Sequence, residues 1–385
     1  MKVSAAQARW FRIRRSGLIE PFATPSATAR QLIGVQAQMP AAADVAFFNR
    51  GIDVSPAALK HERLEARTVV RMWGQRNTVH IYAAEDWPLL HTVLRDRESV
   101  MERRLQKVGL WDSFQRLVSQ LEKRVSAGEP LTYKDARSCE DFEKLVAHRN
   151  KWTDIEATPR DAGWVLSYAA FLRLVLAGVV CHGPDQGAES TFVHRESWLP
   201  DLQWSLPDED KAFAELACRY LATYGPSPPR DLASWFGTTV TNAKRWVEAA
   251  GERIIDVEVD GKTAFMNVDD AEDLAATVPA PAKWPIRLLH RFDPYVLGAI
   301  GSKDKNWLID PSHYKKVWRP GAHVEAVVLV GGRIAGTWRY DKKTKGLAIG
   351  IKPFEPFSRT VARAVEKQAK RVAKFLGLDL LGIST

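Results

Sequence analysis

The segment from Asp208 to Val268 constrains the fold of this 385-residue chain more than any other. Its apolar residues recur at helical spacing in three successive stretches, and a glycine closes each stretch. An alternating run from Ile254 to Met266 then folds back at Asp260-Gly261, a pair typical of tight hairpin turns. Three helices followed by a hairpin is the element order of a winged helix-turn-helix. The outward face of its recognition helix would carry Thr241, Asn242, Lys244 and Arg245.

The same order of elements recurs twice, less regularly, in the preceding 200 residues. Residues 1–84 predict helices and then a strand pair, at 4–14, 26–38, 56–66, 69–73 and 78–82. Residues 85–200 predict helices, a short helix after Thr132 and a hairpin wing, at 86–107, 111–127, 164–176 and 179–195. We therefore predict an α+β fold with three tandem winged helix-turn-helix motifs, over residues 1–84, 85–200 and 205–270.

Residues 284–385 predict a β-rich region that ends in a helix. Strands are expected at 324–330, 333–340 and 347–351, joined by a tight turn at Gly331-Gly332 and a lysine-rich turn from Asp341 to Gly346. The last helix, from Ser358, carries an apolar stripe and a basic stripe. We predict that the hairpin and the basic stripe contact DNA, through Arg339, Lys342, Lys343, Lys345, Arg359, Arg363, Lys367 and Lys370. Alternatively, both are solvated surfaces that contact nothing.

The charge of the chain is concentrated near its two ends. The net charge is +9, whereas the stretch from Arg339 to Lys374 has eleven basic and three acidic residues, net +8. Residues 1–30 have six basic and one acidic residue, net +5, so the rest of the chain is slightly acidic. Localised positive charge favours a polyanionic partner, of which nucleic acid is the commonest.

Several classes of protein are excluded by the sequence. No apolar stretch approaches the about 20 residues that cross a bilayer, and the N-terminus lacks the pattern of a signal peptide, so we expect a cytoplasmic protein. The three cysteines and nine histidines lack the spacing of metal ligands, so no metal site is expected. Walker, GxGxxG and GxSxG motifs are absent, and no cofactor is predicted.

Two glutamines, Gln36 and Gln38, stand at the end of an apolar segment that Pro40 is expected to terminate. Paired amides in this position favour a cleft or channel. The alternative is that they cap the helix end or cover its solvated side.

Five motifs are spread in order over nearly the whole chain: Gly34 to Gln38, Thr78 to His80, Leu289 to Gly298, Asp310-Pro311 and Gly331 to Trp338. Together they resemble the AlkZ/YcaQ family of bacterial winged-helix DNA glycosylases. The chain is most similar to the AlkZ branch, because the third position of its Gln-apolar-Gln motif is Gln38 rather than aspartate. It departs from the family pattern at residues 75–80 and 301–305.

The resemblance implies a concave, basic DNA channel built from three winged helices and the C-terminal β-region. It implies hydrolysis of the N-glycosidic bond of N7-alkylated purines in double-stranded DNA, including bulky adducts or interstrand cross-links from alkylating natural products. This would be a function in DNA repair and antibiotic self-resistance. It places Gln36 and Gln38 at the catalytic centre, with Thr78, His80 and Asp293 as candidates that line the site. We expect a monomer.

Neutral amides suit this chemistry. A purine alkylated at N7 carries a positive charge and leaves as a neutral base, so the enzyme needs a positioned water and support for the sugar cation more than a strong acid. Gln36 and Gln38 can hold such a water because each amide both donates and accepts. Asp44 and Asp293 are the carboxylate alternatives.

Two other classes of function remain open from the sequence. A non-catalytic winged-helix regulator would also contain the unit at 208–268, although no heptad segment for a dimer is present. A protein-interaction module could use the fourteen tryptophans. We expect Trp164, Trp235 and Trp246 on core faces, which explains them by packing.

Overall fold

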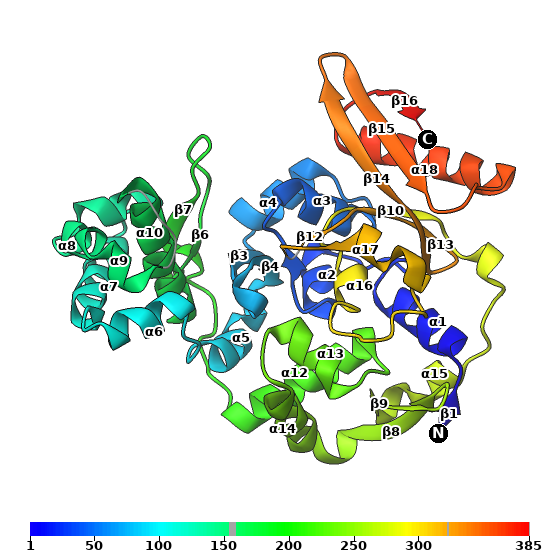
Figure 1. Ribbon diagram of the computed structural model, residues 1–385, viewed down its shortest axis with the longest axis horizontal. Helices are drawn as coiled ribbons and strands as arrows, with labels where there is room; N and C mark the ends of the chain where they lie inside the picture. The colour runs from blue at the N-terminus through cyan, green and yellow to red at the C-terminus, as the bar shows by residue number, and fades with distance from the viewer. Residues whose placement is uncertain (154–158, 322, 385) are drawn as a thin grey trace. The chain divides into compact units, whose positions relative to one another are not determined.

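The computed structural model describes residues 1–153, 159–321 and 323–384. The chain divides into two compact units, and helices and strands are mixed in both, as the predicted α+β class requires (Figure 1). The larger unit contains Met1–Glu62, Gln75–Ala83 and Glu209–Thr385, and the smaller unit contains Arg63–Gly74 and Ala84–Asp208. Within the described residues, no helix is long and apolar enough to cross a membrane.

The smaller unit, drawn in cyan and green, is mainly helical (Figure 1). Its elements are β3 (Val69–Trp73), α5 (Trp87–Leu94), α6 (Val100–Lys107), α7 (Trp111–Ser126), β5 (Leu131–Thr132), a 3-10 helix (Tyr133–Ser138), α8 (Phe142–Ala147), α9 (Arg149–Trp152), α10 (Pro159–Leu176), β6 (Val180–His182), β7 (Thr191–His194) and α11 (Arg195–Trp198). The predicted single helix over 86–107 is wrong. Ser99 begins a new helix there, because its side chain and that of Glu102 form a reciprocal capping box.

Aromatic rings form the centre of the smaller unit. Phe171 and Phe192 stack with ring centroids 4.1 Å apart, and Trp73 stacks on Phe192 at 5.6 Å. The prediction that Trp164 faces the core is wrong, since 56% of its surface is exposed and it stacks on the neighbouring Tyr168. Trp235 and Trp246, both in the larger unit, are buried as predicted.

The N-terminal part of the larger unit differs from its prediction at the glutamines. Its elements are β1 (Lys2–Val3), α1 (Ala5–Arg15), α2 (Pro25–Gln31), β2 (Val35–Gln36), α3 (Pro40–Phe48), α4 (Pro56–Leu64, which runs to the unit boundary), a 3-10 turn (Gln75–Asn77) and β4 (Val79–Ala83). The helix predicted over 26–38 ends at Gln31, and Gly34 then turns the chain with φ +88°. A side chain at Gly34 would collide with the Tyr82 ring, 2.4 Å from an added Cβ. Pro40 begins a helix instead of ending one, as proline readily does at a first helical position.

The elements predicted over 208–268 are confirmed. They are α12 (Glu209–Tyr224), α13 (Pro229–Phe236), α14 (Val240–Ala250), β8 (Ile254–Val259) and β9 (Lys262–Asn267). Gly237 closes α13 with φ +67°, and the Thr239 side chain caps α14. The structure adds β1, which pairs in parallel with β8. A short helix, α15 (Ala271–Ala275), follows.

The C-terminal part of the larger unit is a sheet covered by one long helix (Figure 1). Its elements are β10 (Arg287–Leu289), α16 (Pro294–Leu297), α17 (Tyr314–Val317), β11 (Trp318–Arg319), β12 (His323–Val324), β13 (Val327–Val330), β14 (Arg333–Lys343), β15 (Gly346–Pro353), α18 (Arg359–Phe375) and β16 (Leu380–Ser384). The strand order is β10-β13-β14-β15-β16. Val365 and Val372 of α18 pack on Ile349 and Trp338 of the sheet, so the apolar stripe of the last helix faces the core as predicted.

The two predicted turns of this sheet are both present, one of them shorter than expected. Gly331 and Gly332 both have positive φ and join β13 to β14. The second turn was expected over 341–346, but Lys342 and Lys343 belong to β14 and pair with Leu347 and Gly346. The hairpin of β14 and β15 is therefore longer than predicted, and its turn contains only residues 344 and 345.

Candidate active site

Gln36 lies opposite His80 because β2 and β4 pair antiparallel. Its side chain is buried, with 7% of its surface exposed, and its Oε1 accepts a hydrogen bond from Arg76 at 3.0 Å. The same Arg76 nitrogen lies 3.2 Å from Nε2 of His80, and another of its nitrogens donates to the carbonyl oxygen of Trp235. The strand pairing thus assembles a buried polar cluster around one of the two predicted catalytic glutamines.

Gln38 is exposed, but its side chain is hydrogen-bonded to the backbone of β4. Its Oε1 accepts a hydrogen bond from the backbone N–H of Val79 at 3.2 Å. Thr78 precedes this residue, and its carbonyl oxygen lies 2.9 Å from Nδ1 of His80. The structure therefore brings together four of the five predicted site residues, Gln36, Gln38, Thr78 and His80, at the start of β4.

His80 is uncharged in this cluster. Burial lowers its pKa well below the ordinary histidine value, and the nearby Arg76 guanidinium lowers it further. Its Nδ1 faces a carbonyl oxygen and must carry the proton, which leaves Nε2 as the acceptor for Arg76. Burial also lowers the pKa of Arg76 to about 10, so Arg76 stays charged at neutral pH. His80 therefore supplies no proton at neutral pH.

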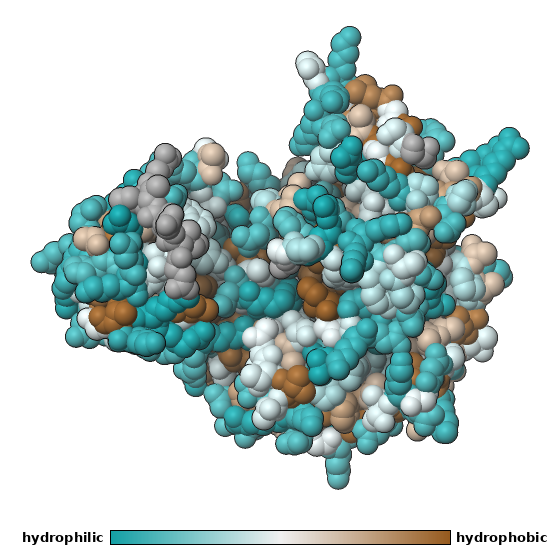
Figure 2. All heavy atoms as spheres, viewed as in Figure 1, coloured by the Kyte–Doolittle hydropathy of each residue, from teal (hydrophilic) through white to brown (hydrophobic). Residues whose placement is uncertain are grey.

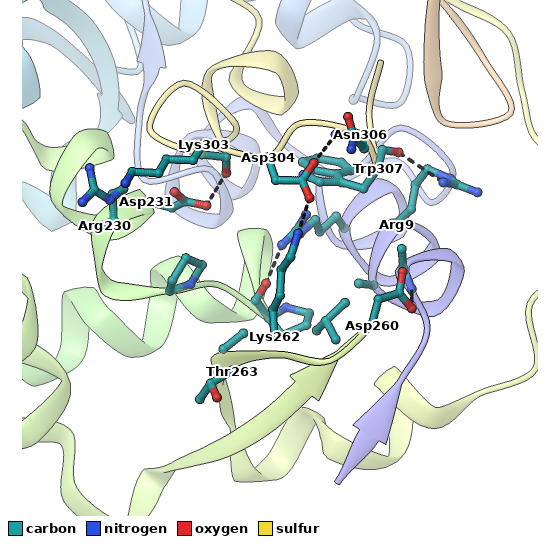
Figure 3. Close-up of a pocket in the computed structure, with 18 of the residues that line it drawn as sticks. Arg9, Arg230, Asp231, Asp260, Lys262, Thr263, Lys303, Asp304, Asn306 and Trp307 are labelled. Atoms are coloured by element: carbon teal, nitrogen blue, oxygen red, sulfur yellow. Dashed lines mark hydrogen bonds and ion pairs between the residues drawn. The ribbon is translucent and has the colours of Figure 1, made fainter. Parts of the chain in front are cut away.

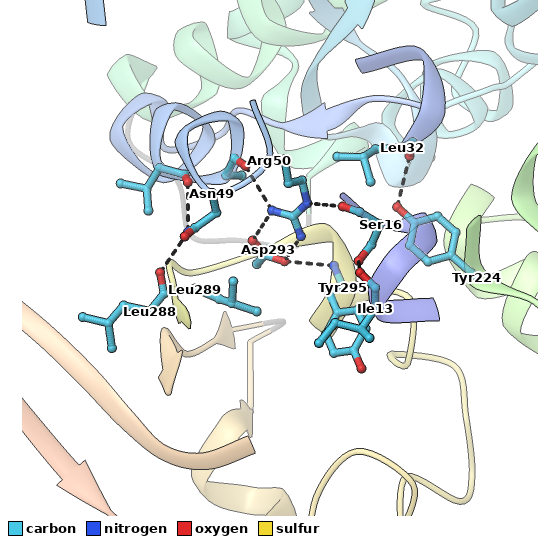
Figure 4. Close-up of polar contacts among 12 residues, drawn as sticks. Ile13, Ser16, Leu32, Asn49, Arg50, Tyr224, Leu288, Leu289, Asp293 and Tyr295 are labelled. Carbon is cyan, nitrogen blue, oxygen red and sulfur yellow. Dashed lines mark hydrogen bonds and ion pairs between the residues drawn. The ribbon is translucent and has the colours of Figure 1, made fainter. Parts of the chain in front are cut away.

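Asp293 is held in a different network, a buried ion pair with Arg50 (Figure 4). Arg50 donates to both carboxylate oxygens, at 2.6 and 2.8 Å, and the backbone N–H of Tyr295 donates to one of them at 2.9 Å. Both side chains are 0% exposed. Asp293 caps α16 and ties it to the end of α3. Its geometry is that of a structural carboxylate. Asp44, the other carboxylate alternative, is half-buried on α3.

His290, three residues before Asp293, makes the stability of the fold depend on pH. Burial lowers the pKa of His290 to about 4, and its ring packs edge-on against Trp338 and Tyr340. Between pH 6.5 and about 4 the unfolded chain binds a proton that the folded chain does not, so stability falls as the pH falls. Between pH 7 and pH 5, we expect the free energy of unfolding of His290→Phe to fall by about 2 kcal/mol less than that of the wild type, measured by urea unfolding. Equal losses for both proteins would contradict this prediction.

The predicted DNA-contacting residues lie on the exposed parts of the hairpin and of α18. Figure 2 shows hydrophilic side chains at the end of the hairpin. Among these residues, Lys370 is paired with Glu366 at 2.6 Å. Sequence reasoning missed a basic groove of about 570 Å³ beside the hairpin. Its cationic residues are Arg291, Lys316, Arg319, Arg339 and Lys352. They come from separate segments, and only Arg339 was singled out by the local density of charge.

A second cavity of about 570 Å³ lies between α1, the β8–β9 hairpin and the loop at 302–307 (Figure 3). Its charges are mixed, since Lys262 pairs with Asp304 there and Arg9 donates to the Trp307 carbonyl at 3.1 Å. Burial raises the pKa of Asp231, another residue of the lining. Neither predicted catalytic glutamine lines this cavity. Across the described ranges, no group of three histidine, cysteine, aspartate or glutamate residues has the arrangement of a metal site.

The similarity of this chain to known proteins extends over almost its whole length. Residues 29–375 match the family described as "DNA glycosylase AlkZ-like". The chain is 28% identical over 392 aligned positions to an interstrand DNA cross-link repair glycosylase of Streptomyces sahachiroi, with 100% of this chain and 99% of that protein covered. The solved structure of the Streptomyces sahachiroi DNA glycosylase AlkZ is similar, with a TM-score of 0.76 at 28% identity over 100% of this chain and 99% of that one. The chain belongs to the AlkZ-like family of DNA glycosylases.

Proposed function

We propose that this DNA glycosylase hydrolyses the N-glycosidic bond of N7-alkylated purines in double-stranded DNA, including bulky adducts and interstrand cross-links, with Gln36 and Gln38 at its catalytic centre. One observation carries the proposal. The two amides of a Gln-apolar-Gln motif are anchored by their carbonyl oxygens, Gln36 to Arg76 in the turn before β4 and Gln38 to Val79 at the start of β4, in a member of this family. The cross-link activity named for the Streptomyces relative supports the choice of substrate.

The chemistry follows from the charge of the lesion. A purine alkylated at N7 departs as a neutral base, and the deoxyribose develops positive charge as the bond breaks. A neutral His80 is consistent with a reaction that needs little acid catalysis. Gln36 and Gln38 hold a water beside the sugar, using their NH₂ groups as donors and the second lone pair of each carbonyl oxygen as an acceptor.

The rest of the chain supplies the DNA-binding surface in this proposal. Winged helix-turn-helix motifs over 1–84, 85–200 and 205–270, with the C-terminal region 284–385, form a concave basic channel for the duplex. In this proposal the enzyme acts as a monomer. It acts where the DNA is, which is expected to be the cytoplasm. The exposed basic residues of the β14–β15 hairpin and α18 support this surface.

The direct test is single-turnover release of 7-methylguanine from a defined duplex, detected as alkali-labile strand cleavage. We expect release by the wild type. A duplex with one interstrand cross-link between N7 positions tests the wider substrate range, with conversion to separable strands as the readout. Salt-dependent DNA binding without release from either substrate would refute the proposal.

Removing charge from the hairpin is expected to weaken the salt dependence of binding. The slope of log K against log salt falls by about 0.9 for each phosphate that the protein no longer neutralises. Changing Lys342, Lys343 and Lys345 to glutamine therefore reduces the slope by up to about 2.7, measured by fluorescence anisotropy with an unmodified duplex. The control replaces Lys107 and Lys123, exposed lysines of α6 and α7. If both proteins keep the wild-type slope, the hairpin contacts no phosphates.

A further inference from the structure

We propose that Arg76 is a positioning residue for the glycosylase reaction, which fixes the orientation of the Gln36 amide so that its NH₂ group is the end offered to water or substrate. The inference rests on the proposed function of Gln36. It concerns a residue that neither the motif nor the charge pattern singled out, in the segment 75–80 where the chain departs from its family pattern.

The orientation of the amide follows from its partner. A guanidinium group only donates hydrogen bonds, so the atom of Gln36 that faces Arg76 at 3.0 Å must be the carbonyl oxygen. Within the described residues, the NH₂ group of Gln36 has no protein acceptor. Gln38 is oriented in the same way, because the backbone N–H of Val79 also only donates. In the part of the chain that the structure describes, both amides therefore have a free NH₂ group, and Arg76 sets this for the buried one.

The fold supports Arg76 from three sides. The turn before β4 holds Arg76 and Asn77 at φ +58° and +53°, a left-handed conformation that is uncommon for residues other than glycine and that clusters at functional sites. The Trp235 carbonyl at the end of α13 accepts from Arg76, and the Trp235 ring lies 5.2 Å from the guanidinium carbon. At Gly237 an added Cβ would lie 2.9 Å from the Arg76 Cα, so this close approach requires glycine.

The charge of Arg76 is directed at neutral groups. Its three acceptors are the Gln36 amide, the His80 ring and a backbone carbonyl, and no carboxylate pairs with it within the described residues. A partly buried cation without a carboxylate partner is costly, and a purely structural role would be filled more cheaply by a neutral side chain. A cation bound to the carbonyl oxygen polarises the amide and strengthens its NH₂ group as a donor. Arg76 therefore both orients and activates Gln36.

The experiment is a double-mutant cycle on the full chain with the 7-methylguanine duplex. It compares the wild type, Arg76→Met, Gln36→Ala and the double variant by their maximal single-turnover rates. We expect Arg76→Met to lower this rate by about 10²-fold, while the half-saturating enzyme concentration stays within about twofold and the salt slope is unchanged. Because Arg76 acts through Gln36, the double variant is expected to be no slower than Gln36→Ala alone.

Two further experiments separate positioning from loss of packing. Arg9→Met removes another partly buried arginine of the same unit and is expected to keep the wild-type rate. Guanidinium ion at low millimolar concentration is expected to raise the maximal single-turnover rate of Arg76→Ala at least tenfold. If Arg76→Met does not fold, Arg76→Lys replaces it in the cycle, since lysine keeps the charge but lacks the fork that reaches several acceptors.

Three results would overturn the inference. They are a wild-type rate in Arg76→Met, a salt slope reduced by about 0.9 with an unchanged maximal rate, which identifies a phosphate contact, and fully additive effects in the cycle. A wild-type rate in Gln36→Ala is a separate outcome, which refutes the catalytic role proposed for Gln36 itself.

Discussion

Replacing Gln36 and Gln38 together by alanine is expected to slow single-turnover release of 7-methylguanine by about 10²–10⁴-fold, with duplex binding retained. The two side chains are the polar groups that the motif places at the proposed centre, and they are anchored to Arg76 in the turn before β4 and to Val79 at its start. Without them, a water is no longer held beside the sugar, although the DNA-binding surface is unchanged. The rate is measured with enzyme in excess over DNA, and binding by anisotropy.

The matched control is Gln106→Ala, which removes a glutamine of α6 that bonds to the neighbouring Glu98 side chain. It should keep the wild-type rate. Full activity in the double variant, together with loss of activity in Asp293→Asn, would transfer the catalytic role from the amides to the carboxylate.

Breaking the ion pair between Arg50 and Asp293 is expected to lower the free energy of unfolding of the larger unit by about 3–5 kcal/mol. In Arg50→Met the Asp293 carboxylate stays buried, and of the groups that bind it in the wild type only the Tyr295 N–H remains. An uncompensated buried charge is costly. Arg50 also donates to the carbonyl oxygens of Ser16 and Ala46, which lose their donor. Urea unfolding at pH 7 measures the effect.

Two variants test the cause of this destabilisation. Arg50→Met combined with Asp293→Leu removes both charges and should recover a large part of the stability, because the penalty comes from the unpaired charge. Lys2→Met breaks an exposed pair with Glu258 in the same unit and should cost about 0–1 kcal/mol. If Arg50→Met costs no more than Lys2→Met, the buried pair is not the stabilising contact that its geometry indicates.

The parts of the fold that were predicted from sequence are those with local signals. Between Asp208 and Val268, helical spacing is closed by glycines, of which Gly237 and Gly251 have positive φ, and Asp260-Gly261 marks the hairpin, so the elements agree with the prediction to within a few residues. The strands after Val324 were predicted for the same reason. In each case the information lies within about ten residues of the element.

The errors occur where distant partners decide the structure. Gln36 belongs to a two-residue strand, and its pairing with His80 depends on a segment more than forty residues later. The apolar run before Pro40 was therefore assigned to a helix. Arg76 gave no signal, because its role depends on Trp235 and Gly237 of a helix far along the chain. The motif identified the glutamines, but the residue that orients one of them came only from the structure.

The ion pair of Arg50 with Asp293 also has a consequence for synthesis of the protein. The two residues are separated by 243 positions, and the smaller unit is encoded between them. At about 5–20 residues per second, a ribosome needs roughly 12–50 s to supply the carboxylate after the arginine. During this interval the first 62 residues cannot complete their packing, whereas the whole of the smaller unit is synthesised before Asp293 is reached. The nascent N-terminal segment therefore has to stay soluble, with Arg50 lacking its Asp293 partner, until the ribosome has passed Asp293. A chain released earlier keeps Arg50 without this partner.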